Sequence, residues 1–181
     1  APPPTPCKSP NSCLRKVLFT SGQEDLISRL LLPDVQRFIE EHRSSDVHAL
    51  SLQFDSVNGI PFARIAEQIV GRQKAATKLP QYAADGILYP PAVNLEQASS
   101  ERTARFKADL LTARGLPEYR VCADLTGGFG VDSFYLSKVF AAVRFAEPDP
   151  WLMSLARHNH RRLGQNNLSY HHSDAEAFLR S

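Results

Sequence analysis

The residues best suited to chemistry are an acidic side chain and the glycine-rich turn that follows it. Asp124 stands near the end of the apolar segment 121–125, and Gly128 and Gly130 follow within six positions. Glycines let a backbone approach a ligand closely, and the helix that we predict from residue 131 would offer unpaired N–H groups. The Asp124 carboxylate would repel a pyrophosphate but attract an ammonium group. The spacing Asp-x-x-x-Gly-x-Gly therefore indicates S-adenosylmethionine rather than a dinucleotide.

A second acidic residue stands where this class of fold binds ribose hydroxyls. Residues 142–146 are predicted to form a second strand that ends in Glu147, 23 positions after Asp124. A helix is expected over residues 150–163, with Gly164 as its stop. Residues 168–172 suggest a third strand, with Asp174 just beyond it. We therefore predict an α/β fold with three parallel strands near residues 120–125, 142–147 and 168–172.

These motifs resemble the first three motifs of class I S-adenosylmethionine-dependent methyltransferases. The resemblance rests on Asp-Leu-Thr-Gly-Gly-Phe-Gly from Asp124, on Glu147-Pro-Asp-Pro and on Ser173-Asp174-Ala175. It implies the cofactor half of a Rossmann-like methyltransferase sheet. The cofactor-binding residues that it implies are Asp124, Thr126, Gly127, Gly128, Gly130, Asp132, Glu147, Asp174 and Ala175. Within this set Asp124 would hold the ammonium group, Glu147 the ribose and Asp174 the adenine amino group.

The upstream sequence narrows the resemblance to one group of methyltransferases. Tyr89-Pro-Pro and the segment 96–107 are similar to a bacterial family related to the RNA cap guanine-N2 enzymes, whose members carry a THUMP-like domain further along. This similarity implies RNA as the partner and N2 of guanine as a possible methyl acceptor. Two alternatives from other classes stay open, a nicotinamide-dependent oxidoreductase and a non-catalytic RNA-binding fragment.

The motif that holds the target amine in such enzymes does not follow the third predicted strand. It is a polar-Pro-Pro-aromatic sequence after the fourth strand, and no such sequence follows Asp174. No catalytic residue is therefore assigned, and we expect that these 181 residues alone do not methylate RNA. In the usual strand order the first strand pairs with the fourth. We therefore expect segment 121–125 to be exposed, with poor solubility or association through that edge.

The chain before the glycine turn divides into three predicted parts. Residues 1–16 hold five of the 13 prolines and read as a disordered leader. Residues 17–80 have helical periodicity and are predicted to form a small N-terminal helical domain, and residues 81–93 a connector. The methyltransferase part would then span residues 94–181, beginning with a helix capped by Asn94 and Gln97 and ending at Gly115.

Two groups of polar residues are candidates for ligand contact. Residues 61–80 carry Arg64, Arg72, Lys74 and Lys78 against a single acidic residue, so this cluster could contact RNA phosphates, or it could be a solvated helix face. Ser99, Ser100, Thr103 and Lys107 either line the amino-acid end of the cofactor or lie on an ordinary helix surface. Trp151 packs either near the adenine or over the sheet edge.

Composition limits the remaining classes of function. The net charge of +2 is too small to argue nucleic-acid binding by itself, and no apolar run is long enough for a membrane span. The three cysteines form no disulfide framework, which fits a reducing, cytoplasmic setting. Four histidines occur after residue 157, but their spacing does not place them on one helix face or one strand face. No metal site is therefore predicted.

Overall fold

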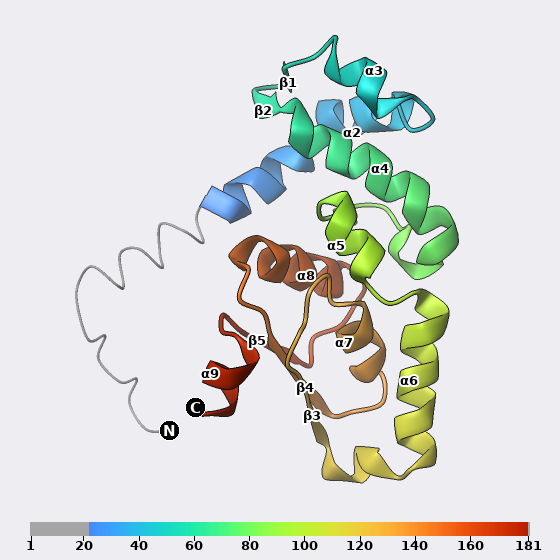
Figure 1. Cartoon of the computed structure of the whole chain (residues 1–181), viewed down its shortest axis with the longest axis vertical. Coiled ribbons are helices and arrows are strands. Elements are labelled where there is room, and N and C mark those ends of the chain that lie inside the picture. The colour runs from blue at the N-terminus through green and yellow to red at the C-terminus, as the bar shows by residue number, and fades with distance from the viewer. Residues whose placement is uncertain (1–21, 181) are drawn as a thin grey trace, which may run out of the picture.

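The computed structural model describes residues 22–180 and shows helices around a three-stranded parallel sheet. Figure 1 places the N-terminal helices at one end of the molecule and the sheet at the other. The predicted capping box at Ser21 and the leader lie outside the described residues. None of the helices described is both long enough and apolar enough to cross a bilayer.

The N-terminal part is helical, as its periodicity predicted. After a helix over residues 22–30, the chain forms α2 (Pro33–Glu41), α3 (Val47–Ser51) and the long α4 (Phe62–Lys78). Asp46 caps α3 by accepting a hydrogen bond from the His48 N–H. The predicted turn before α4 is a small hairpin of β1 (Ser56–Val57) and β2 (Ile60–Pro61). Asn58 and Gly59 make this tight turn possible, because both have positive φ.

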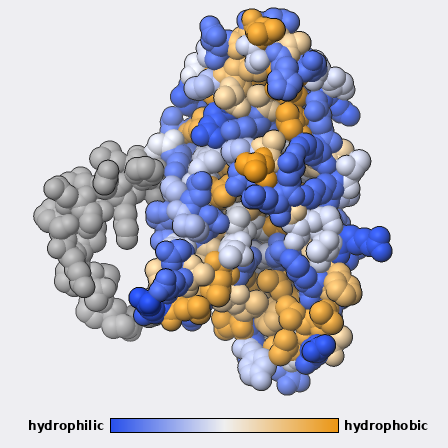
Figure 2. Space-filling model, in the orientation of Figure 1, coloured by the Kyte–Doolittle hydropathy of each residue, from blue (hydrophilic) through white to orange (hydrophobic). Residues whose placement is uncertain are grey.

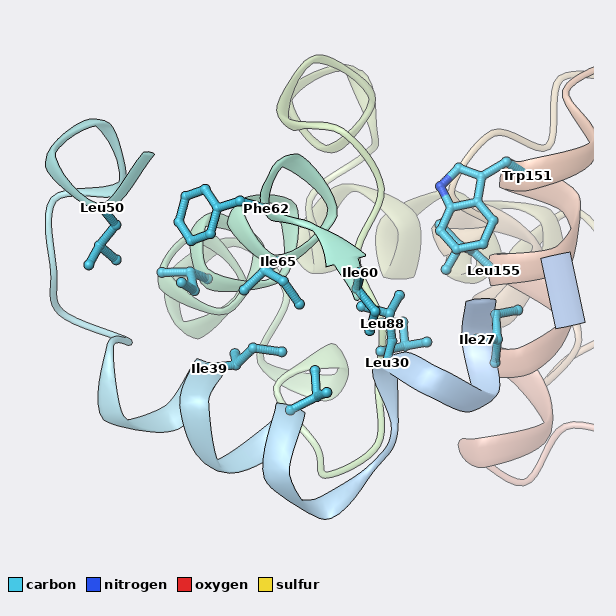
Figure 3. Close-up of a cluster of buried hydrophobic side chains, with 12 residues drawn as sticks. Ile27, Leu30, Ile39, Leu50, Ile60, Phe62, Ile65, Leu88, Trp151 and Leu155 are labelled. Atoms are coloured by element: carbon cyan, nitrogen blue, oxygen red, sulfur yellow. The ribbon is translucent and has the colours of Figure 1, made fainter. Parts of the chain in front are cut away.

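The N-terminal helices share a hydrophobic core with the helix that follows β4. This helix, α8, spans Pro150–Arg162. Its Trp151 and Leu155 pack with Ile27, Leu30 and Ile60 in one buried cluster (Figure 3). The Arg64 guanidinium also lies 5.3 Å from the centre of the Trp151 ring. Trp151 therefore packs against the N-terminal helices rather than over a sheet edge, and whether those helices are an independent domain stays a prediction.

The segment predicted as a connector is partly buried, and buried side chains hold it by hydrogen bonds. It contains the short helix η1 (Pro80–Tyr82), and the side chains of Leu88 and Tyr89 are at most 2% exposed. The side-chain amide of Asn159 on α8 both donates to and accepts from the backbone of Leu88. The amide of Gln68 on α4 makes the same pair of bonds with Tyr89. Two buried side chains thus join the helical part to the sheet part through this segment.

The helix predicted over residues 94–115 is in fact two helices. They are α5 (Ala92–Gln97) and α6 (Glu101–Ala113), and the short helix η2 (Leu116–Tyr119) follows. The break falls at Ala98, which has extended backbone angles. Ser100 caps α6 by accepting from the Thr103 N–H, so the caps predicted at Asn94 and Gln97 were wrong. A serine hydroxyl competes for backbone N–H groups and favours such a helix start.

The three predicted strands are confirmed, and all of them are parallel. They are β3 (Val121–Asp124), β4 (Ala142–Ala146) and β5 (Leu168–His171), in the order β3-β4-β5. The helix α7 (Val131–Leu136) follows the glycine turn, and α9 (Ala175–Leu179) follows β5. Gly164 follows the end of α8, and its φ of 81° prevents the helix from continuing. This order of strands and helices is that of a partial Rossmann-like sheet.

One face of the sheet is covered and the other is largely open among the described residues. Val143 and Phe145 are buried, whereas Arg144 between them is exposed. The same alternation occurs in β3, where Val121 is 47% exposed. An apolar run such as segment 121–125 is typical of a strand buried on both faces, but here one face of β3 is open and leaves Val121 exposed. Figure 2 shows apolar residues gathered on the lower part of the molecule, where Figure 1 draws α6 and β3.

Candidate functional site

The three acidic residues singled out from the sequence follow consecutive parallel strands. Asp124 ends β3, Glu147 directly follows β4, and Asp174 lies three residues beyond β5. Because carboxyl ends of parallel strands lie along one edge of a sheet, this is the edge at which open α/β folds bind ligands. The glycine turn, residues 126–130, starts from the same edge.

The glycine turn is fastened to the sheet by backbone hydrogen bonds. The Gly127 N–H donates to the Ala146 carbonyl at 2.9 Å, and the Gly130 N–H donates to the Gly127 carbonyl at 2.8 Å. A Cβ at Gly127 would lie 2.3 Å from the Phe145 ring, so only glycine fits there. Gly128 and Gly130 have φ values of 53° and 85°, which glycine adopts without strain.

The Glu147 carboxylate holds this turn from the neighbouring strand. Its two oxygens accept hydrogen bonds from the N–H groups of Gly128, at 2.7 Å, and Asp149, at 2.8 Å. The residue is only 6% exposed, so these two bonds offset the cost of burying its charge. A carboxylate has about four acceptor positions, and the two oxygens thus retain capacity for ligand hydroxyls.

A buried histidine supports the last glycine of the turn. His160 on α8 is fully buried, and its Nε2 lies 2.8 Å from the Gly130 carbonyl oxygen. A carbonyl only accepts, so Nε2 carries the proton and Nδ1 accepts from the Tyr170 hydroxyl at 2.9 Å. Burial lowers the pKa of His160 to about 4, which keeps the ring neutral. Burial likewise raises the pKa of Tyr170. The sequence reasoning considered His160 only as a metal ligand and missed this role.

Asp124 is oriented by its own neighbours. Its carboxylate accepts from the Ser133 hydroxyl at 2.6 Å and from the Thr126 N–H at 3.2 Å. Asp174 is exposed and caps α9 by accepting from the Ala177 N–H at 2.7 Å, and Ala175 is the first residue of that helix. Both carboxylates thus have local structural roles that spacing in the sequence did not reveal.

A polar pocket of about 290 Å³ opens between the glycine turn and α5–α6. Its walls include four predicted turn residues, Thr126, Gly127, Gly128 and Gly130, together with Asp132. Asn94, Gln97, Ser99 and Lys107 line the opposite side. The structure therefore brings five of the nine predicted residues together in one pocket, whereas Asp124, Glu147, Asp174 and Ala175 lie outside its lining, at or after the carboxyl ends of the strands.

An ion pair crosses this pocket. The Lys107 ammonium donates to Asp132 Oδ2 at 2.7 Å and to the Ser99 hydroxyl at 2.9 Å. The other oxygen, Asp132 Oδ1, is shielded from solvent and has no hydrogen-bond partner among the described residues. Of the four polar residues predicted near the cofactor, Ser99 and Lys107 thus belong to the pocket, whereas Ser100 and Thr103 form a helix cap.

The basic residues of α4, the candidate RNA contacts, are each engaged within the protein. Arg64 pairs with Glu67 at 3.0 Å, and Arg72 pairs with Glu40 at 2.9 Å. Lys74 pairs with Glu96, and Lys78 donates to the carbonyls of Leu95 and Glu96. The partners of Arg72 and Lys74 lie on α2 and α5, far away in the sequence, so the local sequence could not reveal them. Of the two alternatives for α4, a solvated helix face therefore fits better than a group of basic residues free to bind RNA phosphates.

Metal binding and exposure of the edge strand can both be compared with the residues that the structure describes. No group of three or more His, Cys, Asp or Glu side chains in the described range is arranged to hold a metal ion. Val121 on the edge strand is exposed, and so are Phe106, Leu110 and Tyr119 nearby in sequence. Association of chains through this edge stays a prediction.

Comparisons with known proteins support the fold. No family model matches the chain, and no curated protein sequence matches it. A solved structure described as a "putative methyltransferase from Porphyromonas gingivalis W83" is similar, with a TM-score of 0.62 and 24% sequence identity. The similarity covers 87% of this chain and 37% of that one. The chain thus shares the fold of a longer protein and spans about a third of its length.

Proposed function

We propose that this chain binds S-adenosylmethionine at the glycine turn and forms the cofactor-binding part of an RNA methyltransferase. The observation that carries this proposal is the polar pocket beside the turn, where the opposite charges of Asp132 and Lys107 lie 2.7 Å apart. A ligand that donates a charged hydrogen bond to this partly exposed carboxylate gains affinity. The ammonium group of the cofactor's amino-acid portion is such a donor.

The rest of the pocket complements the same ligand. Lys107 supplies a positive charge 2.7 Å from Asp132, and the amino-acid portion of the cofactor is a zwitterion with a carboxylate beside its ammonium. We therefore assign the ammonium to Asp132 and the carboxylate to Lys107, whereas the sequence alone favoured Asp124 for the ammonium. Asp124 instead orients Thr126 and Ser133 at the base of the turn.

The remaining predicted residues would hold the nucleoside. Glu147 would accept from the ribose hydroxyls with the acceptor positions that Gly128 and Asp149 leave free. Asp174 would accept from the adenine amino group. The bound cofactor supplies an activated methyl group, and the protein contributes its position and the surrounding charge. N2 of guanine in RNA is a possible acceptor, which the resemblance of the sequence motifs implies.

Cofactor binding can be tested by calorimetry with S-adenosylhomocysteine. We expect Asp132→Asn to weaken binding about 10- to 100-fold, the effect of losing one charged hydrogen-bond partner. Asp109→Asn is the matched control, because Asp109 is an exposed carboxylate on α6 outside the pocket. Equal affinities of the two variants would contradict the assignment of Asp132.

A second variant tests the ribose contact, and a second ligand separates the methyltransferase from the oxidoreductase alternative. Glu147→Ala should weaken S-adenosylhomocysteine binding by about 1–3 kcal/mol, because it removes a charged acceptor. Unchanged affinity would mean that the ribose is held elsewhere. Binding of NADH without binding of S-adenosylhomocysteine would favour the oxidoreductase. A labelled-methyl assay on total RNA should show no transfer by this chain alone, and transfer by a soluble monomer would contradict that expectation.

A further inference from the structure

Three arginines on α8 lie close together and have no carboxylate partner among the described residues. Arg157, Arg161 and Arg162 form none of the ion pairs within residues 22–180, in contrast to the basic side chains of α4. Positions 157 and 161 are one helical turn apart on one side of the helix, and Arg162 lines the same pocket. A concentrated positive charge therefore remains unneutralised on α8.

These arginines line one shared pocket, with Arg161 and Arg162 exposed to solvent and Arg157 half-buried. The pocket has a volume of about 550 Å³ and lies between α8 and the helix of residues 22–30. Its walls include the three arginines, His158, Ser154 and Ser28, with Glu24 as the acidic residue among them. Three arginines against one glutamate leave an excess of positive charge, whereas the hydroxyls of Ser154 and Ser28 already donate to Gln23 and to the Glu24 carbonyl.

The guanidinium groups are partly fixed in place. The Arg157 guanidinium lies 5.1 Å from the centre of the Tyr170 ring, and its Nε is buried without a hydrogen-bond partner in the described chain. Arg162 uses its Nε to donate to the Asp85 carbonyl at 2.9 Å. His158 is engaged with the Gly86 carbonyl at 2.7 Å. A preordered guanidinium loses less conformational freedom when it binds a phosphate bidentately.

We propose that this arginine pocket, lined by Arg157, Arg161 and Arg162, binds phosphate groups of the nucleic-acid substrate. Naming RNA as the substrate rests on the proposed function, whereas the phosphate chemistry rests on the arginines. A membrane surface fits less well, since Ile27 is the apolar residue of the pocket and is only 8% exposed. Membrane-binding surfaces instead combine basic residues with exposed apolar side chains.

The position of the pocket suits a substrate that extends away from the reaction centre. α8 starts beside Glu147 and contacts the glycine turn through His160, while the arginines lie on another side of the same helix. A substrate backbone bound by the arginines would therefore run along α8, on a side of the helix other than the one that contacts the turn.

Fluorescence anisotropy with a labelled 12-nucleotide RNA and the matching single-stranded DNA tests this proposal on the full chain. The double variant Arg161→Gln/Arg162→Gln should bind RNA about tenfold or more weakly at low salt. Its slope of log affinity against log salt should fall by about 1.4, because each phosphate contact on a single strand contributes about 0.7. RNA bound in preference to DNA identifies the substrate, and equal binding of both supports the phosphate site alone.

The matched control is Arg102→Gln/Arg114→Gln, which removes the same two charges from exposed positions outside the arginine pocket. It should keep the affinity and salt slope of the unaltered chain. Equal losses in both double variants, no RNA or DNA binding by the unaltered chain, or binding to phosphatidylglycerol vesicles in its place would overturn the proposal. The pocket variant should also keep its affinity for S-adenosylhomocysteine. If no protein binds S-adenosylhomocysteine but the RNA results hold, the proposed cofactor is wrong and the arginine pocket stands.

Discussion

The two sides of the glycine turn, residues 126–130, differ in how they are packed. Toward the sheet and α8, Gly127 lies against Phe145, and Gly130 lies against His160 with no room for a Cβ. Toward α5 and α6, the same turn borders a polar pocket with the Lys107–Asp132 ion pair and an unpartnered carboxylate oxygen. One side is fully packed and hydrogen-bonded, and the other is open to a ligand.

This difference indicates that the turn is held in its conformation before any ligand binds. Its support comes from buried groups, whose removal should destabilise the whole protein. The groups of the pocket are partly exposed, and their removal should affect ligand affinity more than stability. A preordered turn lowers the conformational cost of binding. Variants on the two sides should therefore separate stability from affinity.

The largest expected effect is that of Gly130→Ala on the packed side. The new Cβ would lie 2.7 Å from the His160 ring at a backbone φ of 85°. Overpacking and the left-handed backbone together should lower the free energy of unfolding by about 3 kcal/mol, measured in urea. Gly164→Ala is the matched control, because its φ is 81° but nothing lies within 4 Å of the added Cβ. It should cost about 1 kcal/mol, and equal losses would show that His160 does not restrict this position.

The free energy of unfolding should depend on pH through the protonation of the same buried histidine, His160. Its pKa is lowered to about 4 in the folded protein, against an ordinary value of 6.5. Between these values the unfolded chain binds the proton and the folded protein does not. The stabilisation is therefore complete above about pH 6.5 and is lost as the pH falls toward 4, up to about 3 kcal/mol.

His160→Gln isolates this contribution. Glutamine can still donate to the Gly130 carbonyl but does not titrate, so the difference between the two proteins should shrink as the pH falls from 6.5 to 4. Urea unfolding at a series of pH values measures it. Burial raises the pKa of Glu67, but Glu67 is present in both proteins, so its contribution cancels in the difference. A difference independent of pH would mean that His160 is not buried as a neutral ring.

The smallest effect on stability is expected on the open side, for Lys107→Met. The side chains of Lys107 and Asp132 are 50% and 31% exposed, so losing their ion pair should change the free energy of unfolding by less than about 1 kcal/mol. Affinity for S-adenosylhomocysteine should nevertheless fall about tenfold, because the cofactor carboxylate loses its cation. A large loss of stability would show that the ion pair is a structural contact rather than part of a binding site.

Local patterns in the sequence were enough to predict the sheet and its glycine turn. Short apolar runs that end in Asp124 and Glu147 specify strands, and Gly128 and Gly130 specify a turn that only glycines adopt readily. The stop at Gly164 and the cap at Asp46 depend on the same kind of local chemistry. Each of these signals involves residues a few positions apart, which is the range over which a sequence can be interpreted without a fold.

Tertiary structure alone decided which of the predicted residues share a pocket and which are occupied elsewhere. Lys107 and Asp132 are 25 residues apart, and Gly130 and His160 are 30 apart, so no periodicity links them. The sequence suggested that Arg72 and Lys74 of α4 are available, but they pair with carboxylates on α2 and α5, while the arginines of α8 form no ion pair within the described residues. The sequence thus determined the strands, the turn and the charges. Packing determined which charges are neutralised, because ion pairing depends on distance in space.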